Sequence, residues 1–529
     1  MPIDPRELPD AHRLDPRASD SNRARLGLVL ALLAAGLLRF WALPHGVPFS
    51  VQVDEPEVMV RAVRMMKTGD LNPHFYDYPT LYMYLQTLVA TGRFLFGAMR
   101  GEWASLAQAP HEAFYVWGRA VTALMGTATV WVLYSVGMRW GRQTALLAAV
   151  MFAVMPLHVR ESHFVLTDVP VTFFVMLAVL LSLRAHERGS SPGFALAGVA
   201  VGLAAATKYN GAVALIVPLL CAVLTPAIRP SRTAAVLAAI GGMLAGFLAG
   251  APYTLIDLPI FLNQFARLSA EYRTVVPGAD PVWLIYLKHL RNALGWPGSA
   301  IVLAGLAFGV VRAATGPSRL KWLVAVLFPL VYFRFISNQN LVFGRYLLPL
   351  LPLLSLLGAT AVVAAVAGLR HTGLARRGRN AVIIGLTFVA VAPPAYTSIA
   401  FDADAARVWT TEQAYHWILV NVPKGSKVTM ESRQILLPDA YRTTYLAQLR
   451  LQPFERFIEQ DVEYLVASSQ CYGPYLNVAA GGPQRHPEEY ADYVNIFGRT
   501  EELARFTPTP DHPGPELRIL KIRKSAPTP

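Results

Sequence analysis

Long apolar stretches recur through the first four hundred residues and are separated by short polar segments. A helix that crosses a bilayer needs ~20 mostly apolar residues. The stretches that approach this requirement are 25–43, 79–98, 113–138, 143–157, 169–185, 193–207, 211–228, 233–253, 298–312, 321–336, 344–368 and 381–400. Beyond residue 400 the pattern predicts a helix over 410–420 and strands over 427–431, 462–469 and 517–522. We therefore predict an α-helical polytopic membrane protein with a small C-terminal α/β domain.

The composition agrees with this division. Of the 529 residues, 54% are hydrophobic and only 15% are charged, whereas soluble proteins are ~25% charged. Cys221 and Cys471 are too few for a disulfide framework. Because many of the basic residues behind the net charge of +13 lie between apolar stretches, we expect the membrane, and no nucleic acid, as a partner.

Basic residues set the orientation, because cytoplasmic loops accumulate Lys and Arg. If 79–98 lies on the outer surface as an interfacial helix, all basic loops share the side of the Arg-rich N-terminus. These loops contain Arg139 and Arg142, Arg184 and Arg188, Arg229 and Arg232, and Arg370, Arg376, Arg377 and Arg379. The prediction is then eleven spans in the cytoplasmic (inner) membrane.

The predicted domains follow from this topology. Residues 1–24 form a cytoplasmic tail, 25–400 the transmembrane module and 401–529 an extracytoplasmic domain. Two long outer loops cover 44–112 and 254–297, and the second contains an amphipathic helix over 283–294.

Acidic residues stand at the start of several predicted outer segments. Asp54 and Glu55 precede Pro56, so they are either helix caps or carboxylates that accept a proton from a hydroxyl group. Asp77 and Asp168 also precede prolines, and the same two interpretations apply to them. Their outer-face location favours a functional role for the set.

Isolated cations lie on the same side, against the positive-inside trend. Four cations are placed near the outer ends of predicted helices: Arg119, Lys208, Arg334 and Arg345. Each could extend to the membrane surface as a snorkelling side chain, but together they indicate an anionic ligand such as phosphate. Because the chain has no nucleotide-binding fingerprint, a lipid-linked phosphate fits best.

Further candidate substrate contacts lie in the same outer loops: His74, Tyr78, Arg160 and His163. The spacing of His158 and His163 does not place both on one helical face, which disfavours a metal site there. No cofactor is predicted with certainty, and a divalent metal stays open.

Five segments, in order, resemble the motifs of a known superfamily. They are Asp54-Glu55-Pro56, Tyr76-Asp77-Tyr78-Pro79-Thr80-Leu81, Leu166-Thr167-Asp168-Val169-Pro170, Ala206-Thr207-Lys208-Tyr209 and Gly344-Arg345-Tyr346-Leu347-Leu348-Pro349. Over residues 25–400 the chain resembles the C-type membrane glycosyltransferases. The most similar group comprises the protein O-mannosyltransferases (glycosyltransferase family 39) and the bacterial aminoarabinose transferases.

The resemblance implies transfer of a sugar from a polyprenyl- or dolichyl-phosphate carrier, with inversion at the anomeric carbon. By motif position, Asp54 is the base or orienting acid with Glu55 beside it, and Asp77 and Asp168 are the further loop acids. The donor phosphate is held by a set of four residues: Arg119, Lys208, Arg345 and Tyr346.

The acceptor is left open as a lipid, a glycan or a protein. Where mannosyltransferases have a His-Pro-Pro-type segment, and aminoarabinose transferases an acid followed by Lys-Pro, this chain has Asp77-Tyr78-Pro79-Thr80. The alternative from another class is a lipid or polysaccharide transporter or flippase. Transporters usually contain inverted repeats with interrupted helices, and this sequence has no matching halves. A scaffold without catalysis is a third hypothesis, which the clustered acids and cations oppose.

Overall fold

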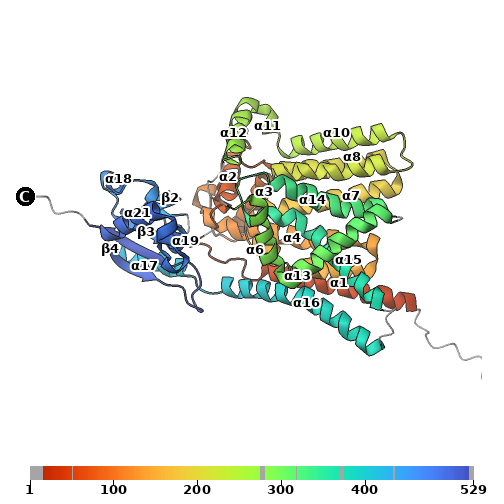
Figure 1. Ribbon diagram of the computed structural model, residues 1–529. Coiled ribbons are helices and arrows are strands. Elements are labelled where there is room, and N and C mark those ends of the chain that lie inside the picture. Colours follow the sequence, from red (N-terminus) through yellow and green to blue (C-terminus); the bar gives the residue numbers. More distant parts are fainter. Residues whose placement is uncertain are drawn as a thin grey trace, which may run out of the picture.

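A computed structural model describes residues 16–50, 52–274, 280–316, 318–369, 375–432 and 435–523. Most of the predicted tail, residues 1–15, lies outside the described residues. The chain forms a helical bundle with the C-terminal domain beyond one of its ends (Figure 1). The start of α1 lies at the opposite end of the bundle.

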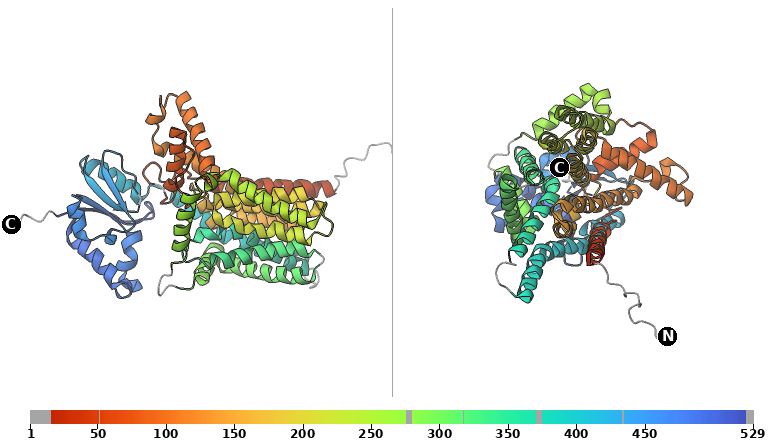
Figure 2. Two further views of the ribbon diagram at one scale, coloured as in Figure 1. Left: turned by 90° about the horizontal axis from the view of Figure 1, so that it is seen from above. Right: turned by 90° about the vertical axis from the view of Figure 1, so that its right-hand side faces the viewer.

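Most bundle helices run along a common direction (Figure 2). They are α1 (Pro16–Phe40), α4 (Tyr115–Gly137), α5 (Arg142–Ala153), α7 (Asp168–Arg188), α8 (Ser191–Thr207), α9 (Ile216–Leu224), α10 (Arg232–Gly250), the second part of α13 (Val282–Thr315), α14 (Arg319–Ile336), α15 (Leu351–Gly368) and α16 (Arg376–Ala405). The short 3-10 segments η4 (Tyr209–Leu215) and η5 (Gly344–Leu350) precede α9 and α15. Each of the eleven predicted spans overlaps one of these helices.

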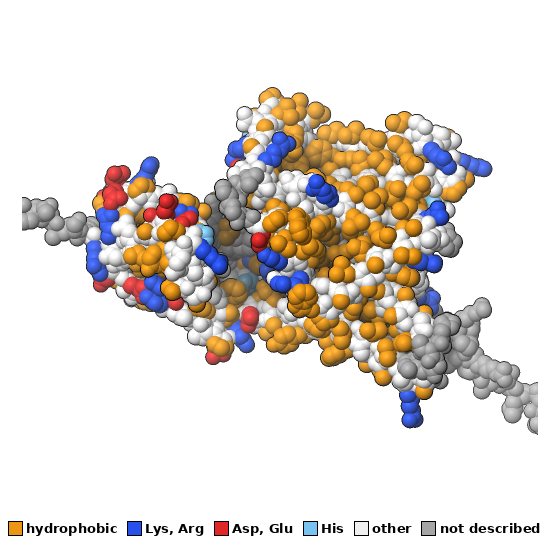
Figure 3. All heavy atoms as spheres, in the orientation of Figure 1, with side chains coloured by type: hydrophobic (Ala, Val, Ile, Leu, Met, Phe, Trp, Pro, Cys, Tyr) orange, Lys and Arg blue, Asp and Glu red, His pale blue; other side chains and the backbone are white. Residues whose placement is uncertain are grey.

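By length and composition, six helical stretches among the described residues are sufficient to cross a membrane. They are His111–Trp140, Asp168–Arg188, Arg232–Gly250, Val282–Thr315, Gly344–Gly368 and Ile384–Asn421. Shorter apolar helices cover Arg142–Ala153, Ser191–Thr207 and Tyr209–Leu224. A broad apolar surface covers the bundle, with Lys and Arg towards its ends (Figure 3). The protein is a multi-pass membrane protein.

Small residues allow neighbouring bundle helices to approach closely, as in many membrane proteins. A Cβ atom on Gly202 of α8 would lie 2.2 Å from the carbonyl oxygen of Met243 on α10. A Cβ on Gly246 of α10 would lie 2.5 Å from the carbonyl oxygen of Val199 on α8. The two backbones therefore pack directly against each other and fix the direction of α8, which ends at Lys208.

Several helices lie at the end of the bundle that faces the C-terminal domain. They include α2 (Glu55–Thr68), α3 (Leu81–Met99) and α12 (Leu258–Glu271). Figure 2 shows the α2–α3 segment lying across this end, and α3 is not among the six sufficiently long and apolar stretches. The backbone of α13 kinks at Gly295, whose φ of 68° only glycine adopts easily, so 282–294 forms a separate helix.

The C-terminal domain contains one mixed five-stranded sheet in the order β2-β1-β3-β5-β4. Its strands are β1 (Lys427–Glu431), β2 (Arg442–Leu446), β3 (Tyr464–Ser468), β4 (Thr500–Phe506) and β5 (Leu517–Ile522). β1 pairs in parallel with β2 and β3, and β5 pairs antiparallel with β3 and β4. The predicted helix is α17 (Thr410–Asn421), accompanied by α18 (Phe454–Glu459), α19 (Ser469–Leu476) and α21 (Pro487–Gly498).

The basic loops gather at the end of the bundle away from the C-terminal domain. Arg139, after α4, pairs with Glu187 near the end of α7 at 2.5 Å. Both side chains line one surface cavity together with Arg319 and Lys321 of α14. The opposite ends of α7 and α8 carry Asp168 and Lys208. Basic loops and candidate site residues are thus at opposite ends of the same helices.

Candidate active site

Four charged side chains from distant parts of the sequence meet at the end of the bundle nearest the C-terminal domain. Asp54 immediately precedes α2, and Asp168 is the first residue of α7. Lys208 connects α8 to η4 in an extended conformation, and Arg345 is the second residue of η5. All four therefore lie where a helix begins or ends, which leaves their side chains free to converge. We call them the acid–base cluster.

Acids and bases alternate along this cluster. Arg345 Nη2 donates to Asp54 Oδ2 at 2.5 Å, and Arg345 Nε lies 3.5 Å from Asp168 Oδ2. Lys208 Nζ donates to the other oxygen of Asp168 at 2.6 Å. The Asp54 side chain is 27% exposed, whereas that of Asp168 is only 4% exposed. Asp54 is consequently the carboxylate of the cluster that a second reactant can reach.

The side chain of Asp54 is not used as a helix cap. It makes no capping hydrogen bond to α2, and its carboxylate is directed to Arg345 instead. Asp168 likewise makes its ionic contacts to Lys208 and Arg345. Both side chains therefore form ion pairs and do not cap α2 or α7.

A cavity of about 330 Å³ lies beside the cluster. Lys208 and Tyr346 line it together with Asp77, Tyr78, Asn210 and Tyr272. The Lys208 ammonium lies 4.2 Å from the centre of the Tyr346 ring, and the Tyr346 and Tyr272 hydroxyl groups are 2.7 Å apart. The cavity thus combines a cation, aromatic faces and hydroxyl groups, which are groups suited to a phosphorylated sugar.

Burial shifts two titratable groups at this cavity. It lowers the pKa of the Lys208 ammonium, an effect that the neighbouring Asp168 carboxylate opposes. Burial raises the pKa of the Tyr78 hydroxyl, and the negative charge of Asp54 acts in the same direction. Tyr78 therefore stays protonated at neutral pH and can donate a hydrogen bond.

Asp77 lies at the rim of the cavity and outside the acid–base cluster. It does not cap α3, whose N-cap is Thr80. Arg267 of α12 donates to its two carboxylate oxygens at 2.8 and 3.0 Å. Asp77, which lines the cavity, thus joins the first outer loop to α12.

The structure corrects the expected positions of Glu55 and Arg119. Arg119 donates to both carboxylate oxygens of Glu55 at 2.7 and 2.8 Å, and the side chains of Arg119 and Glu55 are 1% and 0% exposed, respectively. Glu55 also accepts from the Val165 backbone N–H at 2.8 Å. Both side chains are buried and paired with each other, and neither lines the cavity, in contrast to the expected positions.

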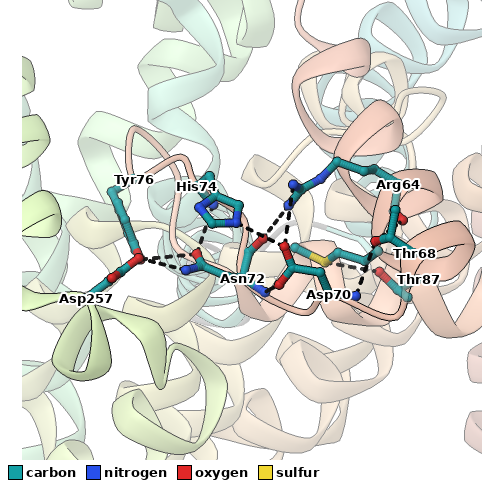
Figure 4. A network of polar contacts seen from close by, with 9 residues as sticks. Arg64, Thr68, Asp70, Asn72, His74, Tyr76, Thr87 and Asp257 are labelled. Atoms are coloured by element: carbon teal, nitrogen blue, oxygen red, sulfur yellow. Dashed lines mark hydrogen bonds and ion pairs between the residues drawn. The ribbon is translucent and has the colours of Figure 1, made fainter.

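His74 lies in a separate polar network, which Figure 4 shows. Its ring contacts Asp70 at 3.0 Å, and its backbone N–H donates to Asn72. Asn72 in turn donates to Asp257, which also accepts from the Tyr76 hydroxyl at 3.2 Å. His74 therefore stabilises the first outer loop against the segment before α12, a correction of its expected substrate contact.

Arg160 and His163 are likewise not brought to the cavity. Arg160 is in α6 (Pro156–Glu161), where its half-exposed side chain pairs with Glu161. His163 is buried, and its ring nitrogens contact the carbonyl oxygens of Val159 and Trp41 at 2.9 and 2.8 Å. The expected substrate contact of His163 is corrected because the ring faces the interior.

Some residues at and near the cavity were not anticipated from the sequence. Tyr272 lines the cavity, and Arg267 binds Asp77; both come from the second outer loop, which provided no motif. Asn210 follows Lys208 by two residues, and its side-chain oxygen is buried without a hydrogen-bond partner. The nearby motif around Lys208 was the only signal that could have indicated Asn210.

Among the residues that the structure describes, no group of three His, Cys, Asp or Glu side chains could hold a metal ion. In the acid–base cluster, Arg345 bridges the two carboxylates. The local positive charges of this site are the guanidinium and ammonium groups. The arrangement can hold an anion on one side and accept a proton at Asp54 on the other.

Comparison with known proteins identifies a matching family model. Residues 30–266 match the family model described as dolichyl-phosphate-mannose-protein mannosyltransferase. No curated protein matches the chain by sequence. The matched region contains Asp54, Asp168 and Lys208, whereas Arg345 lies beyond it.

Solved structures share the fold. ArnT from Cupriavidus metallidurans bound to undecaprenyl phosphate is 15% identical with a TM-score of 0.56, over 96% of this chain and 99% of that one. A second similar structure is AglB from Archaeoglobus fulgidus, an oligosaccharyltransferase in complex with an inhibitory peptide and a dolichol-phosphate. It is 13% identical with a TM-score of 0.53, over 85% of this chain and 70% of that one. The predicted resemblance is therefore confirmed: the chain has the fold of the C-type membrane glycosyltransferases, and its N-terminal half matches their protein mannosyltransferase family.

Proposed function

We propose that the protein is an inverting glycosyltransferase that moves a sugar from a polyprenyl-phosphate carrier to an acceptor at the outer face of the cytoplasmic membrane. The observation that carries this proposal is the acid–base cluster beside the cavity, within a fold shared with glycosyltransferases. Lys208 and Arg345 offer fixed positive charge, and Asp54 is the accessible carboxylate. The similar structures of ArnT and AglB contain undecaprenyl phosphate and a dolichol-phosphate, respectively, which supports a lipid-phosphate carrier.

The proposed reaction is a single displacement. The acceptor hydroxyl attacks the anomeric carbon, and its proton passes to Asp54. The bond from that carbon to the phosphate oxygen breaks, and the phosphate leaves with the electron pair. Lys208 and Arg345 stabilise the charge that develops on the leaving phosphate, and attack from the opposite face inverts the anomeric carbon.

Within this proposal, Asp168 is a positioning residue. It contacts both Lys208 and Arg345, so it holds the two cations at a fixed separation. A sugar-donor phosphate competes with Asp54 and Asp168 for the cations. Tyr346, beneath the Lys208 ammonium, forms one wall of the same site.

The proposed topology has eleven spans, a cytoplasmic N-terminus, and the site and C-terminal domain outside. The gathering of Arg139, Arg319 and Lys321 at the other end of the bundle supports this orientation. The transporter alternative gains no support from the comparisons. The acceptor, whether lipid, glycan or protein, is left open.

A strain lacking the protein tests the function. We expect one polyprenyl-phosphate sugar to accumulate and one envelope glycan to lose that sugar, with recovery by wild type and not by Asp54→Asn. The purified protein should also convert the accumulated lipid to polyprenyl phosphate in detergent when extract from the deletion strain supplies the acceptor. Unchanged lipids and glycans in the deletion strain contradict the proposal. Vectorial movement of intact lipid without sugar transfer would favour the transporter.

Cysteine labelling tests the topology. Ser105→Cys, in the exposed segment between α3 and α4, should react with an impermeant maleimide in intact cells. Ser318→Cys, exposed at the start of α14, is the matched control and should react only after permeabilisation. Cys221 and Cys471 are buried, so the background is low. The opposite labelling pattern reverses the orientation.

A further inference from the structure

The segment between α1 and Asp54 is attached to the C-terminal domain. We call residues 41–50 the strap. The Leu436 backbone N–H of the C-terminal domain donates to the Phe49 carbonyl oxygen at 2.8 Å. The centre of the Phe49 ring lies 4.9 Å from the ring centres of both Tyr415 and His416 on α17. Phe49 thus anchors the strap by backbone and side chain together.

Two further contacts surround this anchor. The His45 ring lies 4.5 Å from the Trp409 ring, immediately before α17. The hydroxyl oxygens of Ser50 and Thr411 are 3.5 Å apart. Four of the five docking contacts therefore involve one short stretch of the C-terminal domain, residues 409–416.

The other side of the strap is tied to the acid–base cluster through Arg119. Arg119 Nη1 donates to the carbonyl oxygens of Leu43 and His45 at 3.0 and 2.6 Å. The rest of its guanidinium holds Glu55, the residue that follows Asp54. Arg119 thus joins the two ends of the stretch from Leu43 to Glu55. Phe49 lies in the middle of this stretch, and Asp54 is adjacent to the end that Arg119 holds.

Asp54 itself is fixed by its immediate neighbours. Its backbone N–H donates to the Gln52 side chain at 2.6 Å, and the Gln52 N–H donates to Glu55 at 2.9 Å. Only four residues lie between Phe49 and Asp54. Because the connection is short and Gln52 is hydrogen-bonded to both Asp54 and Glu55, we expect a displacement of Phe49 to shift Asp54.

We infer that the C-terminal domain is a positioning element for catalysis: by docking the strap on α17, it holds the Asp54 carboxylate in place for the reaction. This inference rests on the proposed glycosyltransferase function. It assigns a role to a domain that contributes no side chain to the cavity lining. Phe49, Tyr415 and His416 are its principal positioning residues.

Phe49→Ala in the full-length protein tests the inference. A displacement of a reacting group by about 1 Å costs on the order of 100-fold in rate. We expect kcat to fall by about 10- to 100-fold while KM for the polyprenyl-phosphate sugar stays unchanged, because Lys208 and Arg345 are untouched. The matched control is Val420→Ala on the same α17, where the side chain is 83% exposed, and it should retain wild-type kinetics.

A reversible cross-link separates positioning from simple loss of stability. Ser50→Cys and Thr411→Cys, introduced together into Phe49→Ala, place thiols where the two hydroxyl groups now face each other. Oxidation should restore most of the lost kcat, and reduction should remove it again. The double variant Tyr415→Ala/His416→Ala removes the same ring contacts from the other side and serves if Phe49→Ala does not fold.

Wild-type kcat in Phe49→Ala and in the Tyr415/His416 double variant overturns the inference. So does a loss of activity that an efficiently formed cross-link does not restore. Failure of the proposed glycosyltransferase function gives a different result from failure of the positioning inference alone. In the first case the wild-type protein itself transfers no sugar, which contradicts both the function and the inference.

Discussion

The Arg119 guanidinium holds the Glu55 carboxylate through two hydrogen bonds, with both side chains fully enclosed by protein. This pair connects α4 to the start of α2, 64 residues earlier in the chain. The adjacent acids Asp54 and Glu55 consequently have different environments: one faces Arg345 at the cavity, and the other is part of the interior. Their variants should therefore have different phenotypes.

Glu55→Gln should act on stability. Removing one partner of a buried ion pair leaves an uncompensated charge and costs ~3–5 kcal/mol. We expect a clearly lower Tm in detergent, together with lower expression. Glu57→Gln, which removes a partly exposed ion pair with Arg61, is the control and should lower Tm much less. If Glu55→Gln has the Tm of wild type but no activity, Glu55 takes part in the reaction and the prediction is wrong.

Asp54→Asn should act on turnover. The carboxylate makes no capping bond to α2, so the amide leaves the fold intact while removing the proton acceptor. We expect transfer below detection with Tm within error of wild type, measured with a purified polyprenyl-phosphate sugar and the acceptor extract. Near-normal transfer by this variant contradicts the assignment of Asp54 as the base.

Lys208→Gln and Arg345→Gln should weaken the handling of the sugar donor. A hydrogen bond to a charged group contributes ~1.5–3 kcal/mol, which corresponds to roughly 10- to 100-fold in kcat/KM. Arg345→Lys should recover only part, because an ammonium cannot contact Asp54 and Asp168 as the planar guanidinium does. Arg291→Gln, an exposed cation on α13, is the matched control. Unaltered kinetics in both cluster variants would remove the phosphate site from the proposal.

His45 should make stability depend on pH. Burial lowers its pKa to about 3, and the charge of Arg119 acts in the same direction. An unfolded chain binds a proton at this residue below pH ~6.5, whereas the folded protein does not. The stability contribution of neutral His45 is complete above ~6.5 and falls as the pH decreases from there towards about 3.

The measurement is the difference in Tm between pH 7 and pH 5. This difference should be smaller in His45→Asn than in wild type, whereas His74→Asn, in an exposed position, should match wild type. An equal difference in wild type and His45→Asn contradicts the prediction.

Sequence patterns predicted the strands of the C-terminal domain that lie inside the sheet. The bounds of β1 and β5 were predicted to the residue, because these central strands alternate or concentrate apolar side chains. The edge strands β2 and β4 were not predicted. They expose Arg442 and Glu501, and polar side chains are typical of strands at a sheet edge.

For the candidate site, the sequence likewise indicated some of the residues but not how they pair. Lys208 and Arg345 stood out because they contradict the charge bias of membrane proteins, and the structure brings them together with Asp54 and Asp168. Arg119 gave the same signal in the sequence, yet its partner is Glu55. Which acid faces which cation depends on how α2 and α4 pack, and local sequence does not encode that choice.

The size of the cavity has a consequence for how this protein would meet its sugar donor. Its volume of about 330 Å³ lies at the lower end of ligand pockets, which range over ~300–1,000 Å³. A phosphorylated sugar fits such a space, whereas a long isoprenoid chain does not and must stay dissolved among lipids. For the proposed enzyme, the quantity that governs saturation is then the mole fraction of carrier in the bilayer. Inert lipid added at a constant total amount of carrier lowers the mole fraction of carrier. Turnover should then slow as strongly as when carrier is removed to reach the same mole fraction.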